Sequence, residues 1–433
     1  MFRNSRNYKK WVAGAALLML GVLGAGCGNS EKVDKKVVVE YWHINSENFG
    51  LATVKENIAQ FEKENPNIKV EEKFFNGYMP LMQGVQASLA SGKPPAVVQI
   101  GYNYLSYAAD NIPHMTIDEL IALHPEDKDF LSKNYEPNIL ALGQYKGKQH
   151  GMPYSISNPV LYYNPEIFKA AGLDPTRGPK TWEEVEAFSK QIQDSQGIYG
   201  IYIQEPPDSW AQEAMMFSNG AQILIDSNGK LRTDVDSSEV LEAMGRYAKM
   251  VKNKTAMHTG YEEGFQAFVN GKVAMHIGSI ARQSSIQKNA KFKAGAEVFP
   301  TYGNKKRVVF AGGNNLFVFA KDTEQQKAAW KFIKFLQSPK ALTEWTKGSG
   351  YLPPRKGVAE DPNGLAPILK ENVMLKAAIS QLADVRPWLS FPGKNGLQIE
   401  QVLLDAREAM LSGKMTAEEA WTQAAVKINK LLE

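Results

Sequence analysis

GMPYSISNPVLYYN, residues 151–164, separates two groups of predicted strands and therefore decides the fold. The first group lies before about residue 152, and the second begins at about residue 160 with a strand at 161–163. One more apolar strand, NNLFVFA at 314–320, comes late in the chain. Two α/β lobes account for this division better than one large sheet does.

The segment before residue 151 alternates strands with helices. Val54, Ile58 and Phe61 have helical spacing, and a second helix begins near residue 78 and ends at Gly92. Apolar or alternating strands surround these helices at 37–42, 68–75 and 94–101. The order strand, helix, strand, helix, strand predicts a parallel sheet that is covered on both faces.

The segment after residue 164 repeats this alternation and then becomes helical. Thr181 and Glu184 have the spacing of a capping box at the start of a helix. Strands are predicted at 197–204 and 272–278, and the final third of the chain is predicted to be mostly helical. Thr416 and Glu419 form a second capping box before the last helix.

The N-terminus has the pattern of a secretory signal. Residues 1–10 carry four basic and no acidic side chains, and the sixteen residues 11–26 carry no charge, which is short for a spanning helix of roughly 20 residues. The small residues LGAG precede Cys27, the single cysteine, in a pattern that resembles a bacterial lipobox, although Gly24 stands where leucine is usual. We predict a signal peptide at 1–26 and a lipid-anchored tether at 27–36. The alternative is an ordinary signal peptide or short anchor in which Cys27 is an incidental thiol.

The charge of the chain argues against nucleic acid as a partner. The formal net charge is +4, but residues 1–26 hold four basic and no acidic residues, so the remainder has a formal net charge of zero. No basic stripe remains to neutralise phosphates.

Enzyme motifs are absent from the sequence. The six histidines are scattered without an H-E-x-x-H pair, and there is no G-x-S-x-G, Walker A or dinucleotide-binding glycine pattern. We therefore expect no cofactor, no metal and no catalytic residue. A glycosidase with a pair of catalytic carboxylates remains an alternative, because acidic residues are plentiful.

Aromatic residues, glycines and small polar residues gather just after the predicted strands, for example in NGY at 76–78, SISNP at 155–159 and GGNN at 312–315. Sugars present C–H faces to aromatic rings and hydroxyls to amides and backbone groups. Core packing or a turn is the commoner explanation for each residue alone. Their shared position after strands, where ligand crevices form in α/β sheets, favours a binding site.

Two longer motifs resemble a known family. GMPYSISNPVLYYNPEIFKAAGLDP with KTWEEVEAFSKQI, and the segment 311–355 that ends in TKGSGYLPPR, are similar to the extracellular solute-binding proteins of ABC importers, family 1, the carbohydrate uptake branch. Within it, the resemblance is greatest to the glycerol-3-phosphate-binding members. It runs from about Val37 to the C-terminus.

The resemblance implies a periplasmic-binding-protein-like (type II) α/β fold whose two lobes close like a clamshell. The chain would cross between lobes near 155–158, 311–314 and 352–354. Lobe 1 would comprise 37–154 and 313–351, and lobe 2 would comprise 155–312 and 352–433.

The resemblance also implies ligand-binding residues. Tyr78, Ser157, Trp210, Ser279, Gly313 and Tyr351 match the glycerol-phosphate-binding members in type and context, and Trp42 with His43 matches the start of the first helix. Tyr102 stands where those members have an acidic residue, and Pro392 stands near their phosphate-pairing arginine, with Arg386 the nearest arginine. A phosphate prefers a bidentate cationic partner, so these departures favour a neutral sugar.

We therefore assign expected roles. Tyr78, Trp210 and Tyr351 would stack on the sugar, joined by Tyr102 and Trp388. His43, Ser157, Ser279 and Asn314 would bond hydroxyls, and Gly312 and Gly313 would donate backbone N–H groups. Arg386 is the candidate that would pair with a phosphate.

The predicted function is that of a monomeric, lipid-anchored receptor on the extracellular face of the cell membrane. It would capture a mono- or oligosaccharide and deliver it to the transmembrane subunits of an ABC permease. One alternative is a receptor for glycerol-3-phosphate or a glycerophosphodiester, indicated if Arg386 or a nearby lysine points into the cleft. The sequence is also compatible with a surface carbohydrate-active enzyme and with an accessory domain of a sensor kinase.

Overall fold

The computed structural model describes residues 36–433 except 206, 207 and 229. The predicted signal peptide and Cys27 lie outside the described residues. Within the described part of the chain, no helix has the length and apolar character needed to cross a membrane.

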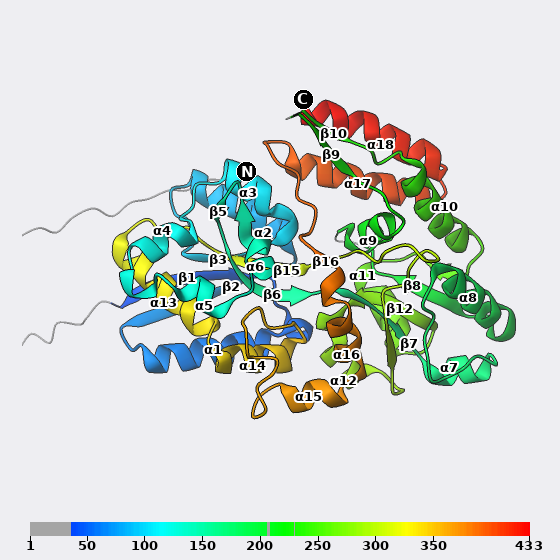
Figure 1. The fold of residues 1–433 in the computed structure, drawn as a ribbon, viewed down its shortest axis with the longest axis horizontal. Helices are drawn as coiled ribbons and strands as arrows, with labels where there is room; N and C mark the ends of the chain where they lie inside the picture. Colours follow the sequence, from blue (N-terminus) through cyan, green and yellow to red (C-terminus); the bar gives the residue numbers. More distant parts are fainter. Residues whose placement is uncertain (1–35, 206–207, 229) are drawn as a thin grey trace, which may run out of the picture. The chain divides into compact units, whose positions relative to one another are not determined.

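A five-stranded mixed sheet forms the centre of the first lobe (Figure 1). Its strands, in spatial order, are β2 (Ile68–Phe74), β1 (Val37–His43), β3 (Val97–Gly101), β15 (Gly312–Val318) and β6 (Met152–Ser157). The first three strands are parallel, but β15 runs antiparallel to both β3 and β6. The predicted parallel pairing of the first three strands is confirmed. The antiparallel pairs are added by β6, which leads out of this lobe, and by β15, which returns to it.

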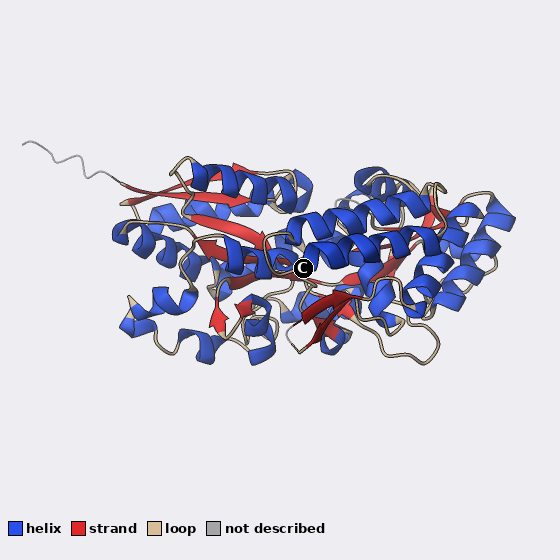
Figure 2. Cartoon of the chain, turned by 90° about the horizontal axis from the view of Figure 1, so that it is seen from above, coloured by secondary structure: helices blue, strands red, loops and turns tan. Residues whose placement is uncertain are grey.

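Both faces of this sheet are buried. On one face, α1 (Leu51–Glu64) and α13 (Thr323–Leu336) pack with Tyr41 and Leu316 of the strands. On the other face, α2 (Tyr78–Ala90) and α3 (Leu105–Asn111) pack with Ile100 and Phe317. Figure 2 shows helices on both sides of the strands. Adjacent strand residues such as Leu316 and Phe317 thus point to opposite cores, which explains why these strands are continuously apolar.

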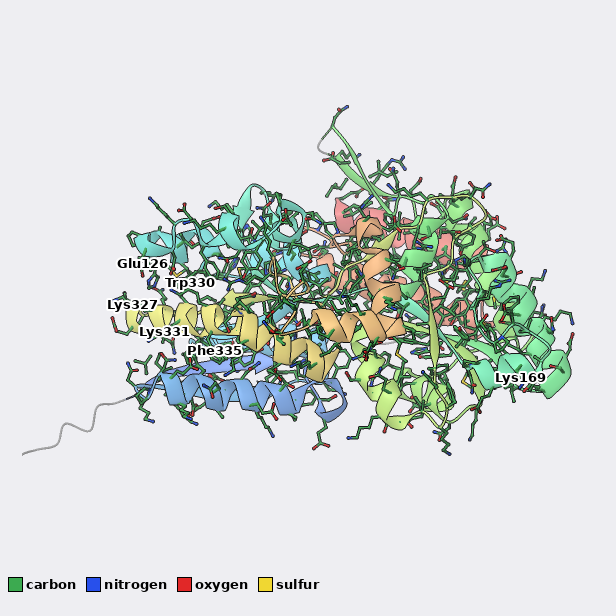
Figure 3. All side chains as sticks on the ribbon, turned by 60° about the horizontal axis from the view of Figure 1, so that its bottom comes forward. Glu126, Lys169, Lys327, Trp330, Lys331 and Phe335 are labelled. Atoms are coloured by element: carbon green, nitrogen blue, oxygen red, sulfur yellow. The ribbon has the colours of Figure 1, made fainter. Side chains whose placement is uncertain are left out.

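Short elements complete the first lobe. They are η1 (Glu47–Phe49), η2 (Tyr102–Tyr104), α4 (Ile117–Ala122), η3 (Pro125–Asp127), α5 (Phe130–Asn134), α6 (Pro137–Leu140), η4 (Ala141–Gly143), β4 (Gln144–Tyr145), β5 (Lys148–Gln149) and α14 (Pro339–Ser349). Figure 3 shows Trp330 and Phe335 spaced along α13, with Glu126 of η3 near Trp330. The indole Nε1 of Trp330 donates a 2.8 Å hydrogen bond to Asp127 Oδ2, so η3 is fastened to α13.

A second five-stranded sheet forms the centre of the second lobe (Figure 1). Its order is β11 (Ala256–Met257), β8 (Tyr199–Ile203), β12 (Val273–Ser279), β7 (Pro159–Tyr163) and β13 (Gly295–Val298). β11, β8 and β12 are parallel, whereas β7 is antiparallel to β12 and β13.

Helices and short strands surround the second sheet and share one large hydrophobic cluster. The helices are α7 (Pro165–Ala170), α8 (Trp182–Gln196), α9 (Trp210–Ser218), α10 (Ser238–Lys252), α11 (Tyr261–Val269), α12 (Gln283–Asn289), α15 (Ala366–Glu371), α16 (Val373–Ser380), α17 (Gly396–Leu411) and α18 (Ala417–Leu432), with η5 (Ile280–Arg282) and η6 (Leu382–Asp384). The hairpin β9 (Leu224–Ser227) and β10 (Lys230–Thr233) lies beside α18, and β14 (Val309–Phe310) pairs with β16 (Val385–Arg386).

Three segments that lead from one lobe to the other are hydrogen-bonded to each other. β6 pairs with β15 through Ser157 and Gly312, and Ile156 exchanges two backbone hydrogen bonds with Leu352, of 2.7 and 3.4 Å. Gly313 has a φ of +112°, and a Cβ there would lie 1.9 Å from the Ser155 carbonyl oxygen. Only glycine fits this close pairing.

Most predicted elements are confirmed, with small changes at their ends. The predicted strand at 272–278, for example, is observed as Val273–Ser279, and Thr416 and Glu419 form the predicted capping box. The strand β6 was not predicted, although it is the first crossing. Gly348 lies inside α14, and Gly350 is the left-handed cap of that helix.

Candidate ligand-binding site

A cavity of about 530 Å³ is lined by residues of both lobes. In the first lobe, the chain supplies Ile44 and Ser46 directly after β1 and Asn76, Gly77 and Tyr78 directly after β2. Carboxyl ends of parallel strands leave room for a ligand because the following segments turn away from the sheet edge.

The second lobe contributes residues in the same manner. Gln204 follows β8, the triplet 261–263 follows β11, and Ser279 with Arg282 lies at the end of β12. Asp208 and Trp210 come slightly later, at the start of α9. The cavity is therefore built by the carboxyl edges of the parallel strands of both sheets.

The structure gathers eight of the predicted site residues around this one cavity. They are Tyr78, Ser157, Trp210, Ser279, Gly312, Gly313, Tyr351 and Trp388. Ser157, Gly312 and Gly313 belong to the crossing segments, so the cavity floor is formed where the lobes are joined.

The other four predicted residues do not line the cavity. His43 is fully buried; its Nε2 lies 2.8 Å from Glu72 Oε2 and its Nδ1 accepts the backbone N–H of Asn45. Burial lowers the pKa of His43 despite the neighbouring carboxylate. Both ring nitrogens are thus occupied within the protein.

Asn314 and Tyr102 lie behind the cavity wall. Asn314 Nδ2 donates to the Tyr78 hydroxyl at 3.1 Å, so this amide fixes a lining ring. Tyr102 is buried, and its hydroxyl has no hydrogen-bond partner among the described residues. Arg386 is exposed in β16, where its Nη1 donates to the carbonyls of Ala383 and Val385.

Tyr351 is packed into the core as well as facing the cavity. Its ring stacks on Trp345 with centroids 5.8 Å apart and planes 10° apart, and Trp345 in turn stacks on Tyr154. Phe49, another lining residue, meets the edge of Tyr351 at 5.5 Å. The ring of Tyr351 is therefore rigidly placed.

Two tryptophans form an aromatic wall on the side of the second lobe. The ring centroids of Trp210 and Trp388 are 6.0 Å apart with planes inclined by 49°. Trp210 Nε1 donates to the Phe310 carbonyl at 3.2 Å, and Trp388 Nε1 donates to Glu213 Oε2 at 3.0 Å. With their polar edges satisfied inside the protein, both indoles can present carbon faces to a ligand.

The cavity lining is more negative than positive. Arg282 is the single cation among the described lining residues, and its guanidinium lies 3.0 Å from Glu262 and donates to the Tyr261 hydroxyl at 2.9 Å. Glu263 and Asp208 add two further carboxyls. Burial raises the pKa of Asp208 to about 6, so this group is mostly ionised at neutral pH.

Sequence reasoning did not select Arg282, Asp208 or the triplet 261–263 as site residues. Each follows a strand of the second lobe closely, which is the same signal that selected Ser279 and Trp210. Their charge made them look like ordinary surface residues, and the sequence does not reveal which side of a turn faces the cavity.

Comparison with known proteins agrees with this architecture. A family model described as a bacterial extracellular solute-binding protein matches residues 56–377. The sn-glycerol-3-phosphate-binding periplasmic protein UgpB of Shigella flexneri is 28% identical and the match covers 96% of each chain. The Escherichia coli protein of the same name is 27% identical over the same shares.

Solved structures show the same fold. UgpB from Mycobacterium tuberculosis, in complex with glycerophosphocholine, has a TM-score of 0.79 and 21% identity, covering 91% of this chain and 98% of that one. The GacH receptor of Streptomyces glaucescens, solved unliganded and with acarbose, has a TM-score of 0.79 and 23% identity, covering 92% and 98%. The predicted two-lobed α/β fold of the periplasmic binding proteins is confirmed.

The packing of Tyr351 predicts how this position responds to substitution. Tyr351→Ala removes a ring from a buried aromatic stack and should lower the free energy of unfolding by about 3 kcal/mol. Tyr351→Phe keeps the stacked ring and should cost about 1 kcal/mol or less. Urea unfolding followed by circular dichroism compares the two. Equal stability of the alanine variant and the wild type would show that the stack contributes little.

Proposed function

We propose, because the chain belongs to the family of bacterial extracellular solute-binding proteins, that it captures a carbohydrate in this cavity and delivers it to an ABC importer. The observation that carries the proposal is the lining itself. Aromatic faces and neutral polar groups come from both lobes, and the single cation among the described lining residues is already paired. Such a surface suits a ligand with C–H faces and hydroxyls.

The site residues differ in how they would act on the ligand. Tyr78, Trp210, Tyr351 and Trp388 would stack on sugar faces. Ser157 and Ser279 would bond hydroxyls, and Gly312 and Gly313 would offer backbone N–H groups. Asn314 would act through Tyr78, to which it is bonded at 3.1 Å, rather than meet the ligand itself.

The mechanism would be selection of the closed state. A ligand that touches both lobes stabilises the arrangement in which the lobes approach, and its differential affinity shifts the equilibrium. Phe49 of the first lobe already lies 5.4 Å from the Arg282 guanidinium of the second. We place the hinge at the three crossings, with lobe boundaries near 154/155, 312/313 and 351/352. The mutual hydrogen bonds of Ile156 and Leu352 support this placement.

A glycerol-3-phosphate or glycerophosphodiester ligand is the second candidate. The names of the relatives and the presence of Arg282 in the cavity support it. Against a phosphate monoester stand the Glu262 carboxylate on Arg282 and the position of Arg386 outside the lining. A phosphate would have to displace or share an existing ion pair.

The panel of ligands that tests the proposal covers both classes. We expect at least one of glucose, maltose and maltotriose to raise the thermal unfolding midpoint of the purified protein, because ligand bound only by the native state adds stability. Glycerol-3-phosphate and glycerophosphocholine should give smaller shifts. Differential scanning fluorimetry provides the measurement, with mannitol at equal concentration as the control for solvent effects.

Each contrary outcome has a definite meaning. A shift with glycerol-3-phosphate or glycerophosphocholine alone would replace the carbohydrate by the second candidate. Steady hydrolysis of maltotriose, abolished by substituting one carboxylate, would overturn the receptor in favour of a carbohydrate-active enzyme.

Ser157 offers a local test of ligand contact. Ser157→Ala should weaken the affinity for the sugar with the largest shift by about two- to tenfold, as expected for one lost hydrogen bond. Ser132→Ala, at an exposed serine of α5 that does not line the cavity, is the matched control and should leave affinity unchanged. Isothermal titration calorimetry measures both. Equal affinities of the two variants would remove Ser157 from the site.

We also propose that Cys27 carries the lipid that holds this receptor, as a monomer, at the outer face of the membrane beside its permease. The support is the position of the single cysteine after an uncharged stretch. Cys27→Ser should move the protein from the membrane fraction of the producing bacterium to the soluble fraction. Immunoblotting of the two fractions decides, and retention of the variant in the membrane would refute the anchor.

A further inference from the structure

A buried carboxyl group stands behind the aromatic wall of the cavity. Glu213, on α9, is 1% exposed, and its Oε2 accepts the indole N–H of Trp388 at 3.0 Å. Its other oxygen, Oε1, accepts the hydroxyl of Ser209. Both carboxyl oxygens therefore accept a hydrogen bond, and one of the donors, Trp388, lines the cavity.

The bond to Glu213 fixes the polar edge of the Trp388 ring, while Trp210 packs against it at a centroid distance of 6.0 Å. It lies in the segment between β16 and α17 rather than inside a helix or strand. A neighbour in that segment, Ser390, accepts the Ser106 backbone N–H of the first lobe at 2.9 Å through its hydroxyl. The segment thus touches α3 of the first lobe while Trp388 faces the cavity.

A second buried carboxyl lies near the first. Glu400, on α17, is 3% exposed, and its Oε1 has no hydrogen-bond partner among the described residues. Burial, then the neighbouring Glu213 and Asp208, raises the pKa of Glu400 well above its usual value. Burial also raises the pKa of Glu213 to about 7, against the opposing hydrogen bonds from Ser209 and Trp388.

The other charged groups around this pair are few. Arg407 of α17 donates to the Asp208 carbonyl and, at 3.4 Å, to Gln212 Oε1. Burial, and then the charges of Glu400 and Asp208, raise the pKa of Tyr104 in η2. His258 Nδ1 lies 2.7 Å from Glu205 Oε2, and the positive charge of Arg407 acts on this histidine. One guanidinium therefore faces three carboxyls, Asp208, Glu213 and Glu400, too few charges to keep all of them ionised together.

We propose that Glu213 is a positioning residue of the ligand cavity, which holds the indole of Trp388 in place, and that protonation of Glu213 makes this hold depend on pH. An ionised carboxylate accepts the indole N–H in a charge-assisted bond that is stronger than the bond to a neutral carboxyl. Protonation near neutral pH therefore loosens Trp388. The importance of this ring for a ligand rests on the proposed function, but the hydrogen bond between Trp388 and Glu213 does not.

The test needs no ligand, so its failure is distinct from failure of the proposed function. Protein labelled with ¹⁵N-tryptophan gives indole N–H resonances, and the Trp388 resonance is identified by its loss in Trp388→Phe. We expect this resonance to shift between pH 5.5 and 8.5 with a midpoint near the pKa of Glu213, about 7.

Three variants separate the causes. Glu213→Gln keeps an acceptor oxygen but no titrating proton, so the Trp388 resonance should remain and lose its pH dependence. A titration caused by Asp208 or His258 would survive in that variant. Glu400→Gln takes the neighbouring carboxyl out of the titration, and the midpoint should stay near 7 because Glu213 is the group that carries the change. Asp405→Asn is the control, at an exposed position of α17, the helix that carries Glu400, and its titration should match that of the wild type.

Two results would overturn the proposal. One is a Trp388 resonance that does not move across this pH range in the wild type. The other is an unchanged titration in Glu213→Gln, which would leave Glu213 a merely structural partner of the indole.

Discussion

The pairing of the three crossing segments is the constraint on which the rest of this structure depends. β6, β15 and the segment at Leu352 bond to each other through backbone groups, and Gly313 lets β15 approach Ser155 where any side chain would collide. Because these crossings also supply Ser157 and Gly312 to the cavity, the joint between the lobes and the floor of the site are the same piece of backbone. Movement at the joint must therefore change the site.

Much of the fold is predictable because both sheets obey simple periodicity. Continuous apolar strands such as 94–101 signal two buried faces, α1 shows apolar residues at helical spacing, and α8 begins at the Thr181 cap. The antiparallel pairing escaped prediction for a physical reason, although 314–320 was predicted as a strand. β6 and β15 pair across more than 150 residues of intervening chain, and local patterns carry no information about which distant strand becomes a neighbour.

The site was predictable to the extent that it follows strand ends. Tyr78, Ser157, Trp210 and Ser279 were selected by that position together with the family resemblance, and they meet around one cavity. His43 also lies at the end of its strand, β1, yet its ring contacts Glu72 and not the cavity, because a strand end can place a side chain on either side of the sheet edge. Arg282 was overlooked because an arginine after a strand is usually a surface residue.

The charges around the cavity favour a ligand without a phosphate monoester. A phosphate taken out of water needs cationic or well-aligned N–H partners to replace its hydration, and the Arg282 guanidinium is already bonded to Glu262 and Tyr261. Asp208 and Glu263 face the same space, so the local field opposes an added anion. Hydroxyl groups, by contrast, gain from carboxylate acceptors in a partly dry cavity, since a charged acceptor strengthens the hydrogen bond while a neutral donor costs little to desolvate. The same carboxylates that disfavour the phosphate therefore support the proposed carbohydrate.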